Sequence, residues 1–197
     1  MTDRYRDKPA SASDGKMFER LCIDTLLPMI GETQTLNEDQ HSQIHVGDTA
    51  GGYEFKELLN ARDRLHIEVA ERKNLDGAWV PSGVHCSRRR YMCGSHREVF
   101  LFSVPALRRW IKATEPEEVW YGRNEATGHA PSWEAETATI RSALLLRDDA
   151  TKLCLYRFEF TGEWIAERTP HGSPSVAWAG QAIKVGKAPE FVMGIWP

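Results

Sequence analysis

Two adjacent glycines, at positions 51 and 52, stand directly in front of the strand-like run Tyr53–Leu58. Glycine adopts the positive φ angles that a tight turn requires, so this pair predicts a reversal of the chain. Side chains alternate between the faces of a strand, and Glu54 and Lys56 should therefore project to the same side. The reversal would set Asp48 roughly opposite Glu54, with Cβ atoms about 5 Å apart. Two carboxylates and one ammonium are expected to meet at one place.

Hydrophobic periodicity predicts the elements around this segment. The expected strands are Ile44–Gly47, Tyr53–Leu58, Arg64–Ala70, Lys152–Phe160 and a hairpin of Arg90–Met92 with Val99–Phe102. One helix is expected after Gly15, with Phe18, Leu21, Cys22, Thr25 and Leu26 on one face, ending at Pro28. A second, short helix should follow Ser103 as its N-cap and Pro105 in its first turn. Residues 140–146 fit a helix or a strand.

Length and composition favour one folded domain. The chain has 197 residues, of which 41% are hydrophobic, enough for a full core. Residues 1–14 are polar and are expected to form a flexible lead-in, followed by a single domain over 15–197 with a core at 15–112 and a C-terminal elaboration at 113–197. No apolar run approaches about 20 residues, and no signal peptide is recognised, so neither a membrane span nor export is expected. The four scattered cysteines favour reduced thiols in a cytoplasmic protein over a disulfide framework.

Charge is distributed unevenly, although the net charge is only -3. Residues 87–112 hold seven Lys or Arg against one acid, and residues 113–136 hold six Glu against one Arg. A local basic block can attract a polyanion even when the total charge is negative. Backbone-phosphate contacts are expected from Arg88, Arg89, Arg90, Arg108 and Arg109. The alternative is an ordinary solvated surface on which charges happen to cluster.

The group around Glu54 has the composition of a site for phosphodiester hydrolysis. This reaction needs charge neutralisation and an activated water molecule, and Mg²⁺ (or Mn²⁺) held by one or two carboxylates supplies both. Asp48 and Glu54 are the expected metal ligands, with the carbonyl oxygen of Phe55 as a third. Lys56, on the same face, would orient the water or neutralise charge in the transition state.

Asp48 followed by Glu54-Phe55-Lys56 resembles the signature of the PD-(D/E)XK nucleases, the restriction-endonuclease-like superfamily. The segment 47–71 also resembles small phage and bacterial members. The resemblance covers about residues 15–112 and implies an α/β (α+β) fold with a central mixed β-sheet flanked by helices, metal-dependent cleavage of nucleic acid, most often DNA, and a possible homodimer. It further implies an acidic residue on the first helix, for which Glu19 is the matching position. Two departures are that Gly47 replaces the usual proline and that the Asp-to-Glu spacing is short.

Other interpretations of the same residues stay open. Glu68 either supports the site, as a metal ligand or as a partner that balances Lys56, or simply faces solvent from a half-buried strand. Glu19 is either part of the site or a surface residue of an amphipathic helix. The cysteine and histidine residues at 85–86 and 93–96 suggest a zinc site, but their spacing matches no strong template.

A second Asp…Glu-x-Lys pattern begins at Asp63 and includes Glu71. No turn separates these two residues, and a strand rising about 3.3 Å per residue would set them more than about 25 Å apart, so this assignment is rejected. For the whole chain, the sequence predicts a metal-dependent DNA endonuclease. The alternatives are a catalytically inactive nucleic-acid-binding or protein-interaction module on the same fold, and hydrolysis of some other phosphoester.

Overall fold

The computed structural model describes most of the chain, and the statements below concern that part. Its ranges are 18–37, 47–58, 63–72, 76–85, 89–95, 98–124, 128–131, 140–161, 164–168, 174–178 and 181–187. The predicted lead-in 1–14, Arg88 and all of the predicted strand Ile44–Gly47 except Gly47 lie outside these ranges. Gly47 itself is not in a strand.

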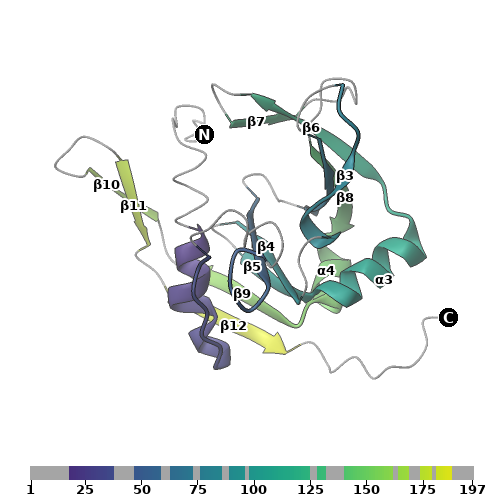
Figure 1. Cartoon of the computed structure of the whole chain (residues 1–197). Helices are drawn as coiled ribbons and strands as arrows, with labels where there is room; N and C mark the ends of the chain where they lie inside the picture. Colours follow the sequence, from purple (N-terminus) through teal and green to yellow (C-terminus); the bar gives the residue numbers. More distant parts are fainter. Residues whose placement is uncertain are drawn as a thin grey trace.

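Most of the described strands form two five-stranded sheets (Figure 1). The first sheet has the order β1 (Tyr53–Glu57), β4 (Arg90–Gly94), β5 (Glu98–Ser103), β9 (Tyr156–Thr161) and β12 (Gln181–Lys187). The second has the order β3 (Val80–Pro81), β2 (Arg64–Glu71), β8 (Ile140–Leu146), β6 (Glu118–Asn124) and β7 (Gly128–Pro131). A separate hairpin pairs β10 (Trp164–Arg168) with β11 (Pro174–Trp178). The first sheet is mixed, because β1 runs parallel to β4 while the other pairs are antiparallel.

The described helical elements are short. Residues 18–21 are α-helical and continue into the π-helical turn η1 (Cys22–Leu26), which is followed by the 3-10 helix η2 (Pro28–Ile30). The others are η3 (Gly83–His85), α3 (Val104–Thr114) and α4 (Arg147–Leu153). In this part of the chain, no helix is long and apolar enough to cross a membrane.

Two cores lie on opposite faces of the first sheet. One core fills the space between the sheets, with apolar side chains from β2, β4, β5, β8, α3 and α4. The other packs the helical segment 18–27 against the first sheet and contains Tyr53 and Phe55 of β1. Because strand side chains alternate, Glu54 and Lys56 project toward the face that carries the second sheet. This arrangement places the polar residues of β1 at the border between the two sheets.

The predicted helix after Gly15 is confirmed over its described part. Phe18, Cys22 and Leu26 are buried, as expected for one face, but Thr25 is exposed. The π-helical turn shifts the register of side chains around the axis, which explains the error at Thr25. The α-helical and π-helical turns end before Pro28, in line with the restriction that proline places on the preceding residue.

Most predicted strands are confirmed, with one boundary error. β1, β2 and the β4–β5 hairpin occupy their expected positions, α3 follows Ser103, and residues 140–146 form a strand. The run Lys152–Phe160 was expected to be a strand throughout, but its first residues belong to α4 and β9 begins at Tyr156. Cys154 accordingly lies in the core between the sheets, whereas Phe158 lies in the other core.

The α+β class is confirmed, but the expected single central sheet is replaced by two. Residues 113–197 contribute to both, since β8 lies between β2 and β6, and β9 lies between β5 and β12. These pairings join strands distant in sequence, which the local hydrophobic pattern does not specify. The two sheets therefore depend on the C-terminal half as well as on residues 15–112.

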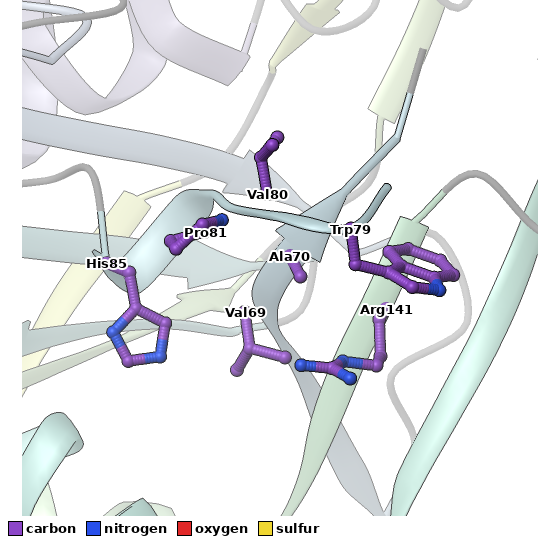
Figure 2. A pocket seen from close by; sticks show the side chains of 7 residues that line it. All are labelled: Val69, Ala70, Trp79, Val80, Pro81, His85 and Arg141. Carbon is purple, nitrogen blue, oxygen red and sulfur yellow. The ribbon is translucent and has the colours of Figure 1, made fainter. Parts of the chain in front are cut away.

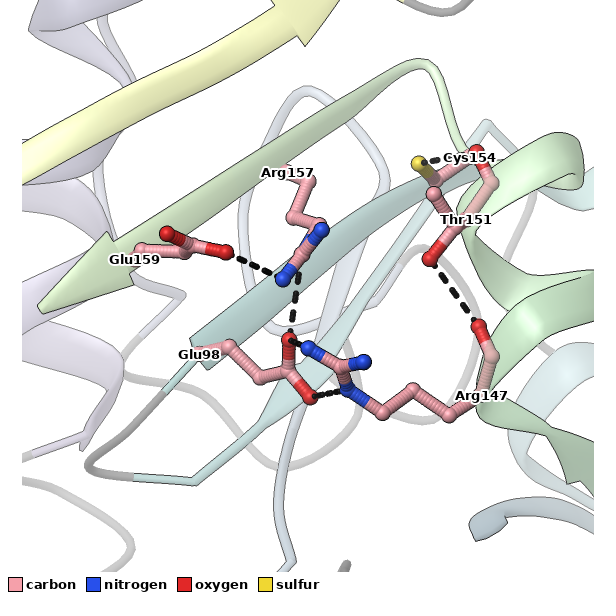
Figure 3. A network of polar contacts seen from close by, with 6 residues as sticks. All are labelled: Glu98, Arg147, Thr151, Cys154, Arg157 and Glu159. Atoms are coloured by element: carbon pink, nitrogen blue, oxygen red, sulfur yellow. Dashed lines mark hydrogen bonds and ion pairs between the residues drawn. The ribbon is translucent and has the colours of Figure 1, made fainter. Parts of the chain in front are cut away.

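Arginine–glutamate contacts connect β5 and β9 of the first sheet to the start of α4 (Figure 3). Glu98, at the start of β5, is 9% exposed and accepts two hydrogen bonds from Arg147 (2.5 and 2.9 Å) and one from Arg157 (3.0 Å). Arg157 also contacts Glu159 within β9. Arg147 opens α4 directly after β8, so the Glu98 carboxylate links the first sheet to the chain leaving the second.

We predict that Glu98→Ala lowers the free energy of unfolding by about 2 to 4 kcal/mol, because it removes the nearly buried carboxylate that accepts hydrogen bonds from both Arg147 and Arg157. Urea unfolding at neutral pH measures the change. The control is Lys152→Ala, which removes an exposed pair with Asp149 and should cost less than about 1 kcal/mol. Equal losses in the two variants would contradict a special role for Glu98.

Candidate active site

The chain reverses immediately before β1, as the glycine pair predicts. The N–H of Gly52 donates to the carbonyl of Thr49 (2.9 Å), and the N–H of Asp48 donates to the carbonyl of Tyr53 (2.7 Å). Only Gly52 of the pair has a positive φ, at 74°. Both glycines were expected to need positive φ angles, so the turn is of a different type from the predicted one.

Asp48 lies along the free edge of β1. Its carboxylate accepts a hydrogen bond from the backbone N–H of Phe55 at 2.7 Å. The N–H and C=O groups of one strand residue point to the same edge, so the Phe55 carbonyl faces the side on which Asp48 lies. Asp48 is a bend residue and not a ladder partner, yet its side chain still reaches the strand that carries Glu54.

The glycine that precedes Asp48 is required by its close approach to β1. Gly47 has φ 120°, and a Cβ atom added there would lie 2.7 Å from the carbonyl oxygen of Tyr53. Proline, with φ fixed near −65°, cannot adopt this conformation. The departure from the proline usual in the resembled family therefore has a local structural reason.

Glu54, Lys56 and Glu68 form a connected cluster. Lys56 Nζ lies 3.0 Å from Glu54 Oε1 and 3.2 Å from Glu68 Oε2. The side chains of Glu54 and Glu68 are 11% and 12% exposed, and that of Lys56 is 33% exposed. Lys56 thus joins β1 of the first sheet to β2 of the second. Of the two interpretations of Glu68, this geometry favours the supporting residue over a solvent-facing one.

Three residues that the sequence did not single out position Glu68. Ser82 Oγ donates to Glu68 Oε1 (2.5 Å), and the backbone N–H of Glu68 donates to Tyr91 Oη (3.3 Å). Gly83, with φ 52°, allows η3 to pack so closely that an added Cβ would lie 2.6 Å from the Glu68 Cβ. The pairing of β2 with β8 also shifts register between Glu68 and Ala70. The sequence Pro-Ser-Gly at 81–83 is typical of a turn, but nothing in it indicates that this turn packs on Glu68.

Burial and like charge raise the pKa values of the carboxyl groups. Burial raises the pKa of Glu54 to about 7, against the lowering effect of Lys56 and with a further increase from Asp48. Burial likewise raises the pKa of Asp48, although the Phe55 N–H and Lys56 oppose this. Burial alone would lower the pKa of the Lys56 ammonium, but Glu68 and Glu54 raise it well above its usual range. Lys56 is therefore a cation at neutral pH, and Glu54 changes charge near pH 7.

The donor set suits a hard divalent cation. When Asp48, Glu54 and Glu68 are all ionised, three carboxylates face one ammonium, which leaves an excess of negative charge. Oxygen ligands of this kind are preferred by Mg²⁺, which needs only one or two carboxylates because it keeps several waters. Asp48 and Glu54 are the pair that would hold it. Within the described ranges, no three His, Cys, Asp or Glu side chains are already grouped as ligands, and Lys56 lies among the acids instead.

Glu19 lies on the other side of β1 from this cluster. It belongs to the helical segment that packs on Tyr53 and Phe55, and its charge helps to raise the pKa of the buried Cys22, after the effect of burial itself. Asp48 contributes to the same effect on Cys22. The structure therefore places Glu19 on the face of β1 opposite to that from which Glu54 and Lys56 project.

The predicted basic residues have different local roles. Arg89 is exposed and directly precedes β4, and Arg90 is half-buried at the first position of β4, where it pairs with Tyr53 of β1. Arg109 is exposed on α3. Arg108, however, donates to the carbonyls of Val84 (3.1 Å) and His85 (2.8 Å) and so anchors η3.

The rejection of the second Asp…Glu-x-Lys pattern is confirmed. Asp63 directly precedes β2 and Glu71 is the last of its eight residues, so the two lie at opposite ends of this strand. For the zinc alternative, Cys86 and His96 lie outside the described residues, and Cys93 is buried in the core between the sheets.

Comparisons of this chain with protein-family models, with curated proteins and with solved structures found no match.

We predict that Glu54→Gln changes the pH dependence of folding. The folded protein holds the Glu54 proton up to about pH 7, whereas the unfolded chain releases it near 4.5, so the contribution of this proton to wild-type stability is fully present below pH 4.5 and is lost as pH rises through 7. Between pH 4.5 and 8, the difference in unfolding free energy should shift in favour of the variant by roughly 2 to 3 kcal/mol. Urea unfolding across this range measures it. The control Glu71→Gln removes an exposed carboxyl and should show no such shift. A difference between Glu54→Gln and the wild type that stays constant with pH would contradict the prediction.

We predict that Gly47→Ala lowers the free energy of unfolding by about 2 kcal/mol or more, because the new methyl group meets the Tyr53 carbonyl and strains the backbone. Gly31→Ala is the matched control: its φ is also positive, at 76°, but no atom lies within 4 Å of the added Cβ. It should cost only about 1 kcal/mol. Thermal unfolding compares the two, and equal shifts would argue against close packing at Gly47.

Proposed function

We propose that this protein is a metal-dependent nuclease that hydrolyses phosphodiester bonds, with DNA as its substrate, on a restriction-endonuclease-like fold. The observation that carries the proposal is the placement of Lys56 Nζ at 3.0 Å from Glu54 and 3.2 Å from Glu68, beside Asp48 on the edge of β1. The resemblance of the Asp48…Glu54-Phe55-Lys56 pattern to the PD-(D/E)XK nucleases supports the same conclusion. The mixed first sheet with a helix on one face is compatible with this fold.

Each residue has a role that follows from its position. Asp48 and Glu54 would hold Mg²⁺ or Mn²⁺, with the Phe55 carbonyl on the same edge of β1. The metal, when bound, supplies a water of lowered pKa and charge neutralisation at the phosphate. Lys56, a fixed cation, orients the water and stabilises the negative charge that develops on the phosphate oxygens. Glu68, held by Ser82, keeps the Lys56 ammonium in place.

Arg89, Arg90 and Arg109 are proposed contacts to backbone phosphates, which would make affinity fall with salt. Arg108 would act indirectly, by holding η3. A homodimer that cuts both strands is proposed from the family resemblance alone. A cytoplasmic location is proposed from the cysteine content. These assignments extend the proposal and do not carry it.

A second candidate is a nucleic-acid-binding module without catalysis on the same fold. The observation that favours it is the double ion pair of Lys56, which occupies the space among the carboxylates and gives β1 and β2 a structural link. In that case the cluster would stabilise the contact between the sheets and no more. A DNA cleavage assay separates the two candidates.

We predict metal-dependent nicking of supercoiled plasmid DNA in Mg²⁺ or Mn²⁺ and none in EDTA. Asp48→Asn and Lys56→Ala should each lower the rate by about 100-fold or more, because each removes a group that acts on the reacting phosphate. Lys152→Ala, which changes an exposed lysine on α4, should cleave as the wild type does. Gel electrophoresis of plasmid and of linear single-stranded DNA measures the products.

DNA binding that persists in EDTA and in both variants, without cleavage, would overturn the nuclease and support the binding module. Release of phosphate from nucleotides without polymer cleavage would instead indicate another phosphoesterase. Circular dichroism of each variant establishes that it is folded before its activity is compared.

A further inference from the structure

A pocket of about 200 Å³ opens on the second sheet, between β2, β3, β8 and η3 (Figure 2). Apolar side chains form much of its wall, among them Val69, Val80 and Pro81. Trp79, His85 and Arg141 complete the lining and provide its polar atoms. The pocket is smaller than those that enclose a whole drug-sized ligand, about 300 to 1,000 Å³, so it suits one group of a larger ligand.

Arg141 is the charged group of this pocket. Its Nε atom is buried and lies 3.3 Å from Glu118, but no described residue accepts a hydrogen bond from it. Figure 2 shows the guanidinium extending from β8 to a position between Trp79 and Val69. This Nε forms an ion pair with Glu118, whereas the Arg141 side chain as a whole is 35% exposed, so the rest of the guanidinium is open to a ligand in the pocket.

Positive charge surrounds the aromatic wall. The guanidinium carbon of Arg72 lies 4.8 Å from the centre of the Trp79 ring, and that of Arg141 lies 5.7 Å from it. Burial, followed by the charges of Arg108 and Arg141, lowers the pKa of His85. His85 is therefore a neutral imidazole at neutral pH, able to donate one hydrogen bond and accept another. The pocket combines an apolar wall, a neutral hydrogen-bonding ring and a partly exposed guanidinium that is paired with Glu118.

The pocket shares its wall with the candidate active site. Val69 directly follows Glu68 in β2, and Pro81 directly precedes Ser82, which bonds Glu68. Arg108 holds η3 through the carbonyl of His85 and so fixes one side of the pocket. The pocket is therefore lined by the same strand and the same turn that position Glu68.

We propose that this pocket binds one unpaired nucleoside phosphate unit of a nucleic-acid strand, with the phosphate at Arg141 and the base against Trp79 and the apolar wall. Aromatic rings and guanidinium planes are the surfaces on which unstacked bases pack, and an arginine binds phosphate oxygens. A base in a duplex is stacked and paired, so it cannot enter such a pocket without leaving the helix. The substrate class is therefore a single strand or a flipped nucleotide. The proposal deepens the proposed function but is testable without cleavage.

The test is fluorescence anisotropy of a labelled single-stranded oligonucleotide in EDTA, over a series of salt concentrations. Arg141→Gln should reduce the slope of log affinity against log salt by about 0.7, the value for one lost phosphate contact to a single strand. Trp79→Ala should weaken binding by about 5- to 100-fold and leave this slope unchanged. Lys152→Gln, an exposed cation away from the pocket, should alter neither quantity.

A pair of variants at Val80 guards against effects on folding. Val80 is 47% exposed at the rim of the pocket, so its replacement leaves both cores intact. Val80→Asp should weaken binding through repulsion of the phosphate, whereas the isosteric but uncharged Val80→Asn should bind at least fivefold more tightly than Val80→Asp. Equal affinity of this pair, together with wild-type binding by Arg141→Gln, would overturn the proposal.

Two competitors identify the ligand. A blunt duplex of the same sequence should compete at least tenfold less well than the single strand, and equal competition would overturn the assignment to an unpaired base. A nucleoside monophosphate that competes as well as the oligonucleotide would overturn the assignment to a strand. If the wild type cleaves DNA but the pocket variants bind the oligonucleotide as the wild type does, the pocket inference is wrong and the nuclease proposal stands. If binding depends on the pocket but no metal supports cleavage, the nuclease proposal is wrong and the pocket inference stands.

Discussion

The ammonium of Lys56 is the contact on which the arrangement of the site depends. It extends from β1 of the first sheet and meets Glu54 on its own strand and Glu68 on β2 of the second. The two acids are almost buried, and a buried carboxylate without a counter-charge is costly. Lys56 therefore stabilises the position at which the edges of both sheets approach each other. The same contact affects the electrostatics, because Lys56 opposes the effect of burial, which raises the pKa of Glu54 to about 7. A group with this pKa responds to a metal ion as well as to a proton, since either one balances the excess charge.

Local features of the site could be predicted from the sequence, and their reasons are local. The turn at Gly52, the common face of Glu54 and Lys56 and the approach of Asp48 to β1 all depend on residues within ten positions of one another. Chain geometry alone restricts such contacts strongly. The division of the strands between two sheets could not be predicted, for the opposite reason. The partners of β2 and β5 are β8 and β9, which come from the C-terminal half, and the hydrophobic pattern of a strand does not name its partner.

The position of Glu68 depends both on its own strand and on residues distant in the sequence. Its alternation with Leu65 and Ile67 left two possibilities open, and only the neighbouring elements decide between them. Ser82 and Tyr91 bond it from β3–η3 and β4, and Gly83 permits the close packing that covers it. None of the three has a sequence signal tied to Glu68, since they lie 14 or more residues away. The short turn at 81–83 could be recognised, but its role depends on which strand it crosses.

The segment from β2 through η3 also connects two sites with different chemistry. Its inner side presents Glu68 to Lys56, and the adjacent residues Val69 and Pro81 line the pocket that contains Arg141. Arg108 anchors this segment through two carbonyl groups, which explains why an arginine expected to bind phosphate is committed to the fold. The segment therefore contributes to two structural features at once, because any change in its path would move both Glu68 and the lining of the pocket.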